Sequence, residues 1–271
     1  MKILVKKYPL VSRYALALVL FVLALFVSVL VNKGVLKQYF PYTAPLLLVL
    51  ATYILYKKEK KSLSAIGLNV NVKNLYFLPL GILIGAFAFF GAKYLRALYN
   101  GEVFEWSTTI DYSTILLAFY FILPQVATEE LLFRGYLFKK TIQASNVVIA
   151  NIVFSILFTV IHVIDESVLS NLGMIIMLTI AIPVGHLLFA TALLKSKTIY
   201  FPIGLHLGNN WATRHLISSS NSGESILYIP NGVSFDTWTP FIITIILFNG
   251  FFLLVTFIIW KWDKILTLFK R

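Results

Sequence analysis

Long apolar runs recur along this chain, and they limit what it can fold into more than any other feature. The 271 residues are 59% hydrophobic and the mean hydropathy is +0.86, well above what a soluble domain needs. A run of about 20 apolar residues is long enough to cross a bilayer as a helix. The sequence therefore predicts an all-α, polytopic membrane helix bundle, in a single integral membrane domain over residues 1–271.

Windows of about 17 to 23 residues with few charges define the expected membrane spans. We expect eight: Tyr14–Val31, Phe40–Tyr56, Leu75–Tyr94, Tyr112–Ala127, Val147–Ile164, Leu172–Leu194, Ile199–Ile217 and Trp238–Trp260. The first follows a basic stretch but ends in SVLVNKG, without a small-residue cleavage site. We therefore expect it to be retained as a helix.

The distribution of positive charge predicts the orientation, because Lys and Arg gather on the cytoplasmic side. If successive connections alternate between the two sides, 17 basic residues fall on the side of both termini. Five fall on the other side: Lys33, Lys37, Lys93, Arg96 and Arg214. Both termini are thus expected in the cytoplasm, in a cell membrane that we take to be bacterial.

The formal net charge of +12 is explained by this topology and by contact with anionic lipids of the bilayer. The chain has no RNA- or DNA-binding motif, so nucleic acid is not expected as a partner. It also has no cysteine, which excludes disulfides, thiolate nucleophiles and cysteine metal ligands.

A charged stretch, TEELLFRG from Thr128 to Gly135, interrupts the apolar pattern. An ionisable group at the centre of a membrane helix costs about 3 kcal/mol, so three charges in six residues need an explanation. We expect Pro124 to end or kink the fourth span, Thr128 to cap a fresh helix, and Glu130 to pair with Arg134 at i,i+4. Glu129 points about 100° away from its neighbour and lies roughly 15 Å inside the hydrocarbon core. It therefore needs a partner on another helix.

The histidines are the candidate partners. His162 lies late in the fifth span, while His206 and Asn210 share one face of the seventh. Any single one of these is most simply a hydrogen-bonded structural histidine, but the set on three helices predicts a polar intramembrane site for water chemistry or ion passage. Counting 1.5 Å per residue from the expected span ends places His162 roughly 24 Å and His206 about 10 Å from the same membrane face. The two would then lie at different depths.

Three motifs occur in order on successive apolar segments: Glu129-Glu130-x-x-x-Arg134, Phe158-x-x-x-His162 and His206-x-x-x-Asn210. Together they resemble the signature motifs of the CPBP family, which includes the type II CAAX prenyl endopeptidases and the bacteriocin-processing and immunity (Abi) proteins. That family's eight-helix plan with cytoplasmic termini also agrees with the expected topology. The motif-bearing catalytic core would be about residues 112–217.

The resemblance implies roles for these residues. Glu129 would be the general base that activates water, and His162 would help to orient it. His206 and Asn210 would hold the oxyanion of the tetrahedral intermediate, while the supporting pair, Glu130 and Arg134, would fix the helix and the charge balance. His186, also within the membrane, matches no motif of the family and is left out of the site.

The same groups could instead bind a divalent metal such as zinc, with Glu129, His162 and His206 as ligands and an open position for water. Family members are often called metalloproteases, but the chain has no HExxH helix. The motifs leave both mechanisms open, and we favour metal-independent glutamate chemistry, which requires no cofactor.

The predicted function is therefore intramembrane endopeptidase, acting on peptide precursors or on the C-terminal segments of membrane proteins. The GxSG and GxGD motifs of other intramembrane proteases are absent. Two alternatives remain: a non-catalytic membrane scaffold or immunity protein of the same family, and a proton-coupled transporter, because buried Glu and His also form proton relays. The complete set of motif positions favours the peptidase.

Overall fold

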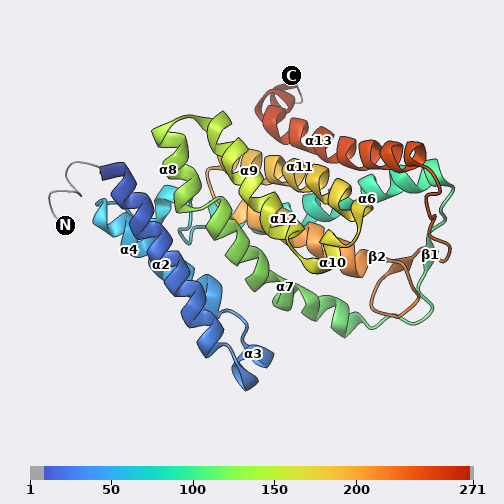
Figure 1. Ribbon diagram of the computed structural model, residues 1–271, viewed down its shortest axis with the longest axis horizontal. Coiled ribbons are helices and arrows are strands. Elements are labelled where there is room, and N and C mark those ends of the chain that lie inside the picture. The colour runs from blue at the N-terminus through green and yellow to red at the C-terminus, as the bar shows by residue number, and fades with distance from the viewer. Residues whose placement is uncertain (1–8, 269–271) are drawn as a thin grey trace.

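The computed structural model describes residues 9–268, and Figure 1 shows that these residues are almost entirely helical. The longer helices are α2 (Pro9–Val31), α4 (Thr43–Lys58), α6 (Phe77–Asn100), α7 (Tyr112–Phe133), α9 (Val147–Val163), α11 (Leu172–Ser196), α12 (Tyr200–Trp211) and α13 (Trp238–Leu268). The shorter helical elements are α3 (Gly34–Tyr39), η1 (Leu63–Ile66), α5 (Val72–Leu75), α8 (Tyr136–Ala144), α10 (Glu166–Leu169) and the π-helical turn η2 (Ala212–Leu216). The prediction of an α-helical chain is confirmed.

A small sheet is the one departure from an all-α chain within the described residues. Its three strands, in the order β1-β3-β2, are β1 (Glu105–Trp106), β3 (Leu227–Tyr228) and β2 (Ile217–Ser218). The strand β3 pairs antiparallel with β1 and parallel with β2. Strands of two residues carry no alternating pattern that a sequence could reveal.

Within residues 9–268, five helical segments are long and apolar enough to cross a membrane. They are Pro9–Val31, Val72–Asn100, Tyr112–Ala144, Leu172–Ser196 and Trp238–Ile265. The expected number of eight is therefore not confirmed. The other three expected spans correspond to shorter helices, since α4 has 16 residues, α9 has 17 and α12 has 12.

Large apolar side chains cover the outside of the long helices. Val19 of α2 is 63% exposed, Leu83 of α6 is 70% exposed and Leu116 of α7 is 67% exposed. Water does not favour so much exposed apolar surface, whereas hydrocarbon does. The exposure pattern and the five apolar segments together describe a membrane protein.

Ionic and polar contacts identify one end of the bundle, which we call the basic end. There Glu59, just after α4, pairs with Arg13 of α2 and with Lys140 of α8. The hydroxyl of Thr198 donates to the carbonyl of Gly67 at 2.9 Å, which brings the α11–α12 connection to the same end. Helix α2 begins at the basic end and helix α13 ends there. Five basic residues of the charge count lie outside the described residues: Lys2, Lys6, Lys7, Lys270 and Arg271.

We call the opposite end, where the three strands lie, the sheet end (Figure 1). The helices α6 and α12 finish at the sheet end, and α7, α11 and α13 begin there, as the connections between them require. Lys93 and Arg96 in the last third of α6, and Arg214 in η2, therefore lie towards this end.

Glycines bring α6 and α12 into backbone contact. A Cβ at Gly85 of α6 would lie 2.0 Å from the carbonyl oxygen of Leu205, and a Cβ at Gly208 of α12 would lie 2.0 Å from that of Ile82. Two glycines four residues apart on each helix, at 81 and 85 and at 204 and 208, allow this approach. The helix α12, buried from Phe201 to Gly208, is thereby fixed in the middle of the bundle, and it carries His206 and Asn210.

Helix α7 runs without a break through Pro124, so the expectation that this proline ends the span and that Thr128 caps a fresh helix is wrong. Proline has no N–H and leaves the carbonyl four residues earlier without its helical donor. That carbonyl, of Tyr120, instead accepts a hydrogen bond at 2.8 Å from the hydroxyl of Tyr42, which lies just before α4. Thr128 lies inside the helix and donates its hydroxyl to the Pro124 carbonyl at 2.8 Å. The helix therefore continues to Phe133.

Candidate active site

Glu130 is the centre of a buried ion-pair network that joins α7 to α12. One of its oxygens, Oε1, accepts a hydrogen bond from Arg134 Nη1 at 3.1 Å and from His206 Nδ1 at 2.8 Å. The side chains of Glu130 and Arg134 are fully buried. The Arg134 guanidinium also lies over the Phe158 ring, 4.3 Å from its centroid, a favourable cation–π contact. The predicted i,i+4 pair is present, and a histidine from another helix completes it.

Glu129 presents one carboxylate oxygen that is held and one that is available. Gln125, one turn earlier in α7, donates to Oε1 at 3.0 Å. The other oxygen, Oε2, lies 3.6 Å from His206 Nε2 and has no hydrogen-bond partner among the described residues. His206 is thus the neighbour on another helix that the depth of Glu129 required.

The hydrogen bond from His206 Nδ1 limits what the other nitrogen of the ring can do. A carboxylate only accepts hydrogen bonds, so Nδ1 carries a proton. In the neutral ring Nε2 then has a lone pair, and it becomes a donor only in the imidazolium form. If His206 is protonated, the cluster has no net charge, because two carboxylates face two cations. These groups are Glu129, Glu130, Arg134 and His206. The ring orientation is fixed further by Phe189, which stacks on it at 4.7 Å.

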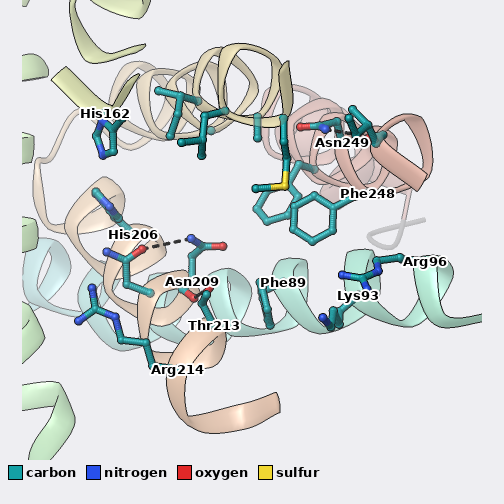
Figure 2. Close-up of a pocket in the computed structure, with 18 of the residues that line it drawn as sticks. Phe89, Lys93, Arg96, His162, His206, Asn209, Thr213, Arg214, Phe248 and Asn249 are labelled. Atoms are coloured by element: carbon teal, nitrogen blue, oxygen red, sulfur yellow. Dashed lines mark hydrogen bonds between the residues drawn. The ribbon is translucent and has the colours of Figure 1, made fainter. Parts of the chain in front are cut away.

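A cavity of about 840 Å³ brings the motif residues together. Glu129, His162, His206 and Asn210 all line it, and Figure 2 shows the two histidines at the same end. The estimate that placed His162 and His206 at different depths is therefore wrong. It assumed that α12 begins at the membrane face, whereas Ile199, just before this helix, is fully buried and its amide donates to the Ile66 carbonyl.

His162 and Asn210 each have one polar group occupied and another free for a ligand. The Phe158 carbonyl accepts from His162 Nδ1 at 2.7 Å, so Nε2 of the neutral ring carries the lone pair. Asn210 Oδ1 accepts from Asn209 Nδ2 at 3.3 Å, and its own amide N–H groups remain available as donors. The catalytic roles of these two residues stay predictions.

Several residues that the sequence analysis did not include also line the cavity. Gln125 and Asn209 contact the motif side chains directly. Lys93 and Arg96 lie at the end of the cavity opposite the two histidines, and Arg214 lies at the His206 end (Figure 2). The i−4 spacing of Gln125 from Glu129 and the position of Asn209 beside Asn210 were visible signals. His186 is not part of the lining. It is 1% exposed and packs beside the Phe138 ring at 5.9 Å.

The structure also shows how the three possible metal ligands, Glu129, His162 and His206, are arranged. Across residues 9–268, no group of three or more His, Cys, Asp or Glu side chains is arranged to hold a metal ion. His206 Nδ1 is engaged by Glu130 and His162 Nδ1 by a backbone carbonyl. These bonds leave Nε2 of each ring as the nitrogen that could bind a metal, so the metal-dependent alternative remains a prediction.

Comparison with known proteins adds one match. Residues 111–212 match the family model described as Type II CAAX prenyl endopeptidase Rce1-like. This match supports the resemblance to the CPBP family. The matched segment runs from the start of α7 to the end of α12 and includes every position of the three motifs. Because the Rce1-like family is a protease family, the match supports a peptidase at the level of the family. No curated protein and no solved structure matches the chain.

Proposed function

We propose that this protein is an intramembrane endopeptidase that hydrolyses a peptide bond with a water molecule activated by Glu129. The observation that carries the proposal is Oε2 of Glu129, which accepts no hydrogen bond from the described residues, lies 3.6 Å from His206 Nε2 and belongs to a residue that lines the same cavity as His162, His206 and Asn210. A general base needs a lone pair that is not already hydrogen-bonded, and Glu129 Oε2 has one.

The first step is attack by water on the peptide carbonyl. The water donates one hydrogen bond to Glu129 Oε2 and the other to His162 Nε2, whose lone pair is free because Nδ1 is bonded to the Phe158 carbonyl. Glu129 takes the first proton as the water oxygen forms a bond to the carbonyl carbon, and the π electrons move onto the carbonyl oxygen. The tetrahedral intermediate then breaks its C–N bond, and the proton held by Glu129 passes to the leaving nitrogen.

The negative oxygen of the intermediate is stabilised by donors that are already in position. Asn210 offers its amide N–H groups, and His206 offers Nε2–H in the imidazolium form that the Glu130 hydrogen bond supports. One such preorganised donor is worth about 3 to 4 kcal/mol of transition-state stabilisation. Glu130 and Arg134 hold the ring of His206 and balance its charge without touching substrate.

Within a membrane, the charge distribution supports an orientation for this site. The basic end would face the cytoplasm, with both termini, and the sheet end would face away from it. Of the five basic residues assigned to the far side, three line the cavity, namely Lys93, Arg96 and Arg214. Peptides or membrane-protein segments would then reach the site from the non-cytoplasmic side. Eight spans require that α4, α9 and α12 also cross the membrane, in addition to the five longer segments.

The proposal is tested with purified wild type and Glu129→Ala in detergent, after thermal unfolding has shown that both are folded. Each is incubated with a library of quenched fluorescent peptides, with and without EDTA or 1,10-phenanthroline. We expect cleavage by the wild type, none by Glu129→Ala, and no effect of the chelators. Inhibition by chelators that an added divalent ion reverses would favour the metalloprotease mechanism. Absence of cleavage by the wild type would favour a non-catalytic scaffold or a transporter.

A further inference from the structure

Three basic side chains line the cavity, and the proposed reaction uses none of them. Lys93 and Arg96 come from α6 and Arg214 from η2. Figure 2 shows Lys93 and Arg96 on the α6 wall, at the end of the cavity opposite His162 and His206. Lys93 and Arg96 therefore form a cationic part of the cavity that is separate from the motif residues, whereas Figure 2 shows Arg214 at the His206 end.

Only one of these three charges is compensated. Arg96 Nη2 lies 2.6 Å from Oε1 of Glu102, whose side chain is fully buried, so this pair is neutral. Neither Lys93 nor Arg214 has a hydrogen bond or an ion pair to any described residue. Glu129 is the one acidic residue of the lining, and it belongs to the balanced cluster with Glu130, Arg134 and His206. The cavity wall thus carries unmatched positive charge.

This unpaired positive charge is energetically unfavourable in the cavity wall, and an anionic ligand would stabilise it. A charged group close to hydrocarbon is unfavourable unless it is paired or reaches water. Arg214 is exposed, but Lys93 is half-buried and its side chain lines the cavity. No ion pair among the described residues explains Lys93 either, and Glu102 is already paired with Arg96.

We propose that Lys93, beside the Arg96–Glu102 ion pair, forms a subsite for a carboxylate of the peptide substrate. This inference rests on the proposed function, because it assigns the far end of the same cavity to the same substrate. Phe89 and Phe248 lie along the walls and give a peptide apolar contacts between its cleaved bond and its carboxylate. The carboxylate is either the C-terminus of the peptide or an acidic side chain, since both present the same pair of acceptor oxygens.

Binding without cleavage tests the subsite directly. Full-length Glu129→Gln in detergent is titrated with one fluorescent apolar hexapeptide in three forms: free C-terminal carboxylate, C-terminal amide, and amide with one internal Glu. We expect at least one carboxylate form to bind about tenfold more tightly than the uncharged amide, which corresponds to roughly 1.4 kcal/mol. The form that gains affinity identifies the source of the carboxylate. Equal binding of the three forms, or no binding, would overturn the subsite.

Variants at the cationic end separate this role from a structural one. In the Glu129→Gln background, Lys93→Gln removes the preference for carboxylate and Lys93→Arg retains it. Lys37→Gln is the matched control, because Lys37 is exposed on α3 at the same end and lies outside the cavity lining. Thermal unfolding checks that each variant is folded. A preference that survives in folded Lys93→Gln contradicts the proposal.

Kinetics distinguish failure of the subsite from failure of the proposed function. In the wild-type background, Lys93→Gln is expected to raise KM for the carboxylate peptide about tenfold with little change in kcat, whereas Glu129→Gln abolishes cleavage. Cleavage without any preference for carboxylate would overturn the subsite and leave the peptidase in place. Carboxylate-dependent binding without cleavage by the wild type would overturn the peptidase and leave the subsite in place.

Discussion

His206 donates from Nδ1 to Glu130 Oε1 at 2.8 Å, and this one hydrogen bond links the buried charges of α7 to the helix that lies at the centre of the bundle. It fixes which nitrogen of the ring faces the cavity and Glu129. The two adjacent glutamates therefore have different parts in the structure. Each keeps one oxygen without a hydrogen bond, but Glu130 is fully buried with its other oxygen bonded twice, whereas the Glu129 side chain is 14% exposed and lines the cavity.

This difference predicts that the two glutamates respond differently to the same substitution. Glu130→Gln leaves the Arg134 guanidinium buried without a counter-charge, and breaking a buried pair in this way costs about 3 to 5 kcal/mol. Glu129→Gln removes no ion pair of that kind, so its Tm in detergent should stay close to that of the wild type while cleavage is lost. Thermal unfolding and peptide cleavage of both variants check the prediction.

The double variant Glu130→Gln with Arg134→Met provides the control, since it removes both charges and leaves a buried side chain of similar length. It is expected to have a higher Tm than Glu130→Gln alone. Equal Tm values for Glu130→Gln and Glu129→Gln would argue that Glu130 has no structural role.

The contact between α6 and α12 gives a second prediction. Gly208→Ala places a methyl group 2.0 Å from the Ile82 carbonyl, so the two helices must separate, and overpacking of this kind costs typically 1 to 3 kcal/mol. Because α12 carries His206 and Asn210, activity should fall together with Tm. Gly250→Ala on α13 is the matched control, since nothing lies within 4 Å of its added Cβ. A Gly208→Ala protein with unchanged Tm would mean that the close approach is not needed.

Much of the site could be predicted from the sequence, because its charged residues stand out against hydrocarbon. Glu129 with a neighbour on another helix, and the pair of Glu130 with Arg134, followed from helix geometry and from the cost of buried charge. The family match over residues 111–212 agrees with the three motifs. The third member of the ion-pair network could not be predicted, since the i,i+4 rule concerns one helix and His206 comes from another.

The errors came from treating each apolar run as an independent membrane span. Pro124 was expected to end or kink the fourth span because its effect on the helix was considered alone. The helix does not end there, since the Tyr42 hydroxyl that replaces the missing donor comes from a distant part of the chain. The depth of His206 was misjudged because α12 begins inside the protein. The glycines at 85 and 208 were a readable signal for the close packing of α12, and the sequence analysis did not use them.

The basic end contains a pH-dependent contact that can be tested apart from activity. Burial raises the pKa of Glu59, but hydrogen bonds from Lys140 and Tyr136 and the charges of Lys140 and Arg13 lower it more, so the folded-state pKa is below its ordinary value. A lowered pKa means that ionised Glu59 stabilises the fold above the ordinary glutamate pKa of about 4.3. This contribution is lost as the pH falls through the lowered folded-state value.

We therefore expect the wild type to have a higher Tm than Glu59→Gln near pH 7, and the difference to shrink in acid below about pH 4. The measurement is thermal unfolding of both proteins in detergent between pH 7 and 3. Glu224→Gln is the control, because Glu224 is exposed and its side chain makes no hydrogen bond or ion pair in the part of the chain that the structure describes. A Tm difference that does not change with pH would contradict the assigned role of Glu59.

The orientation of the cavity gives the last prediction, and the absence of cysteine from the sequence makes it simple to test. Single cysteines are introduced by Ser220→Cys at the sheet end and by Lys61→Cys at the basic end, both at exposed positions. Intact cells that express each variant are treated with a membrane-impermeant maleimide. Because 17 basic residues fall on the side of the termini and five on the other, we expect labelling of Ser220→Cys in intact cells. Lys61→Cys should react only after the cells are opened. The reverse pattern would place the cavity entrance on the cytoplasmic side, and substrates would then have to reach Glu129 from within the cell.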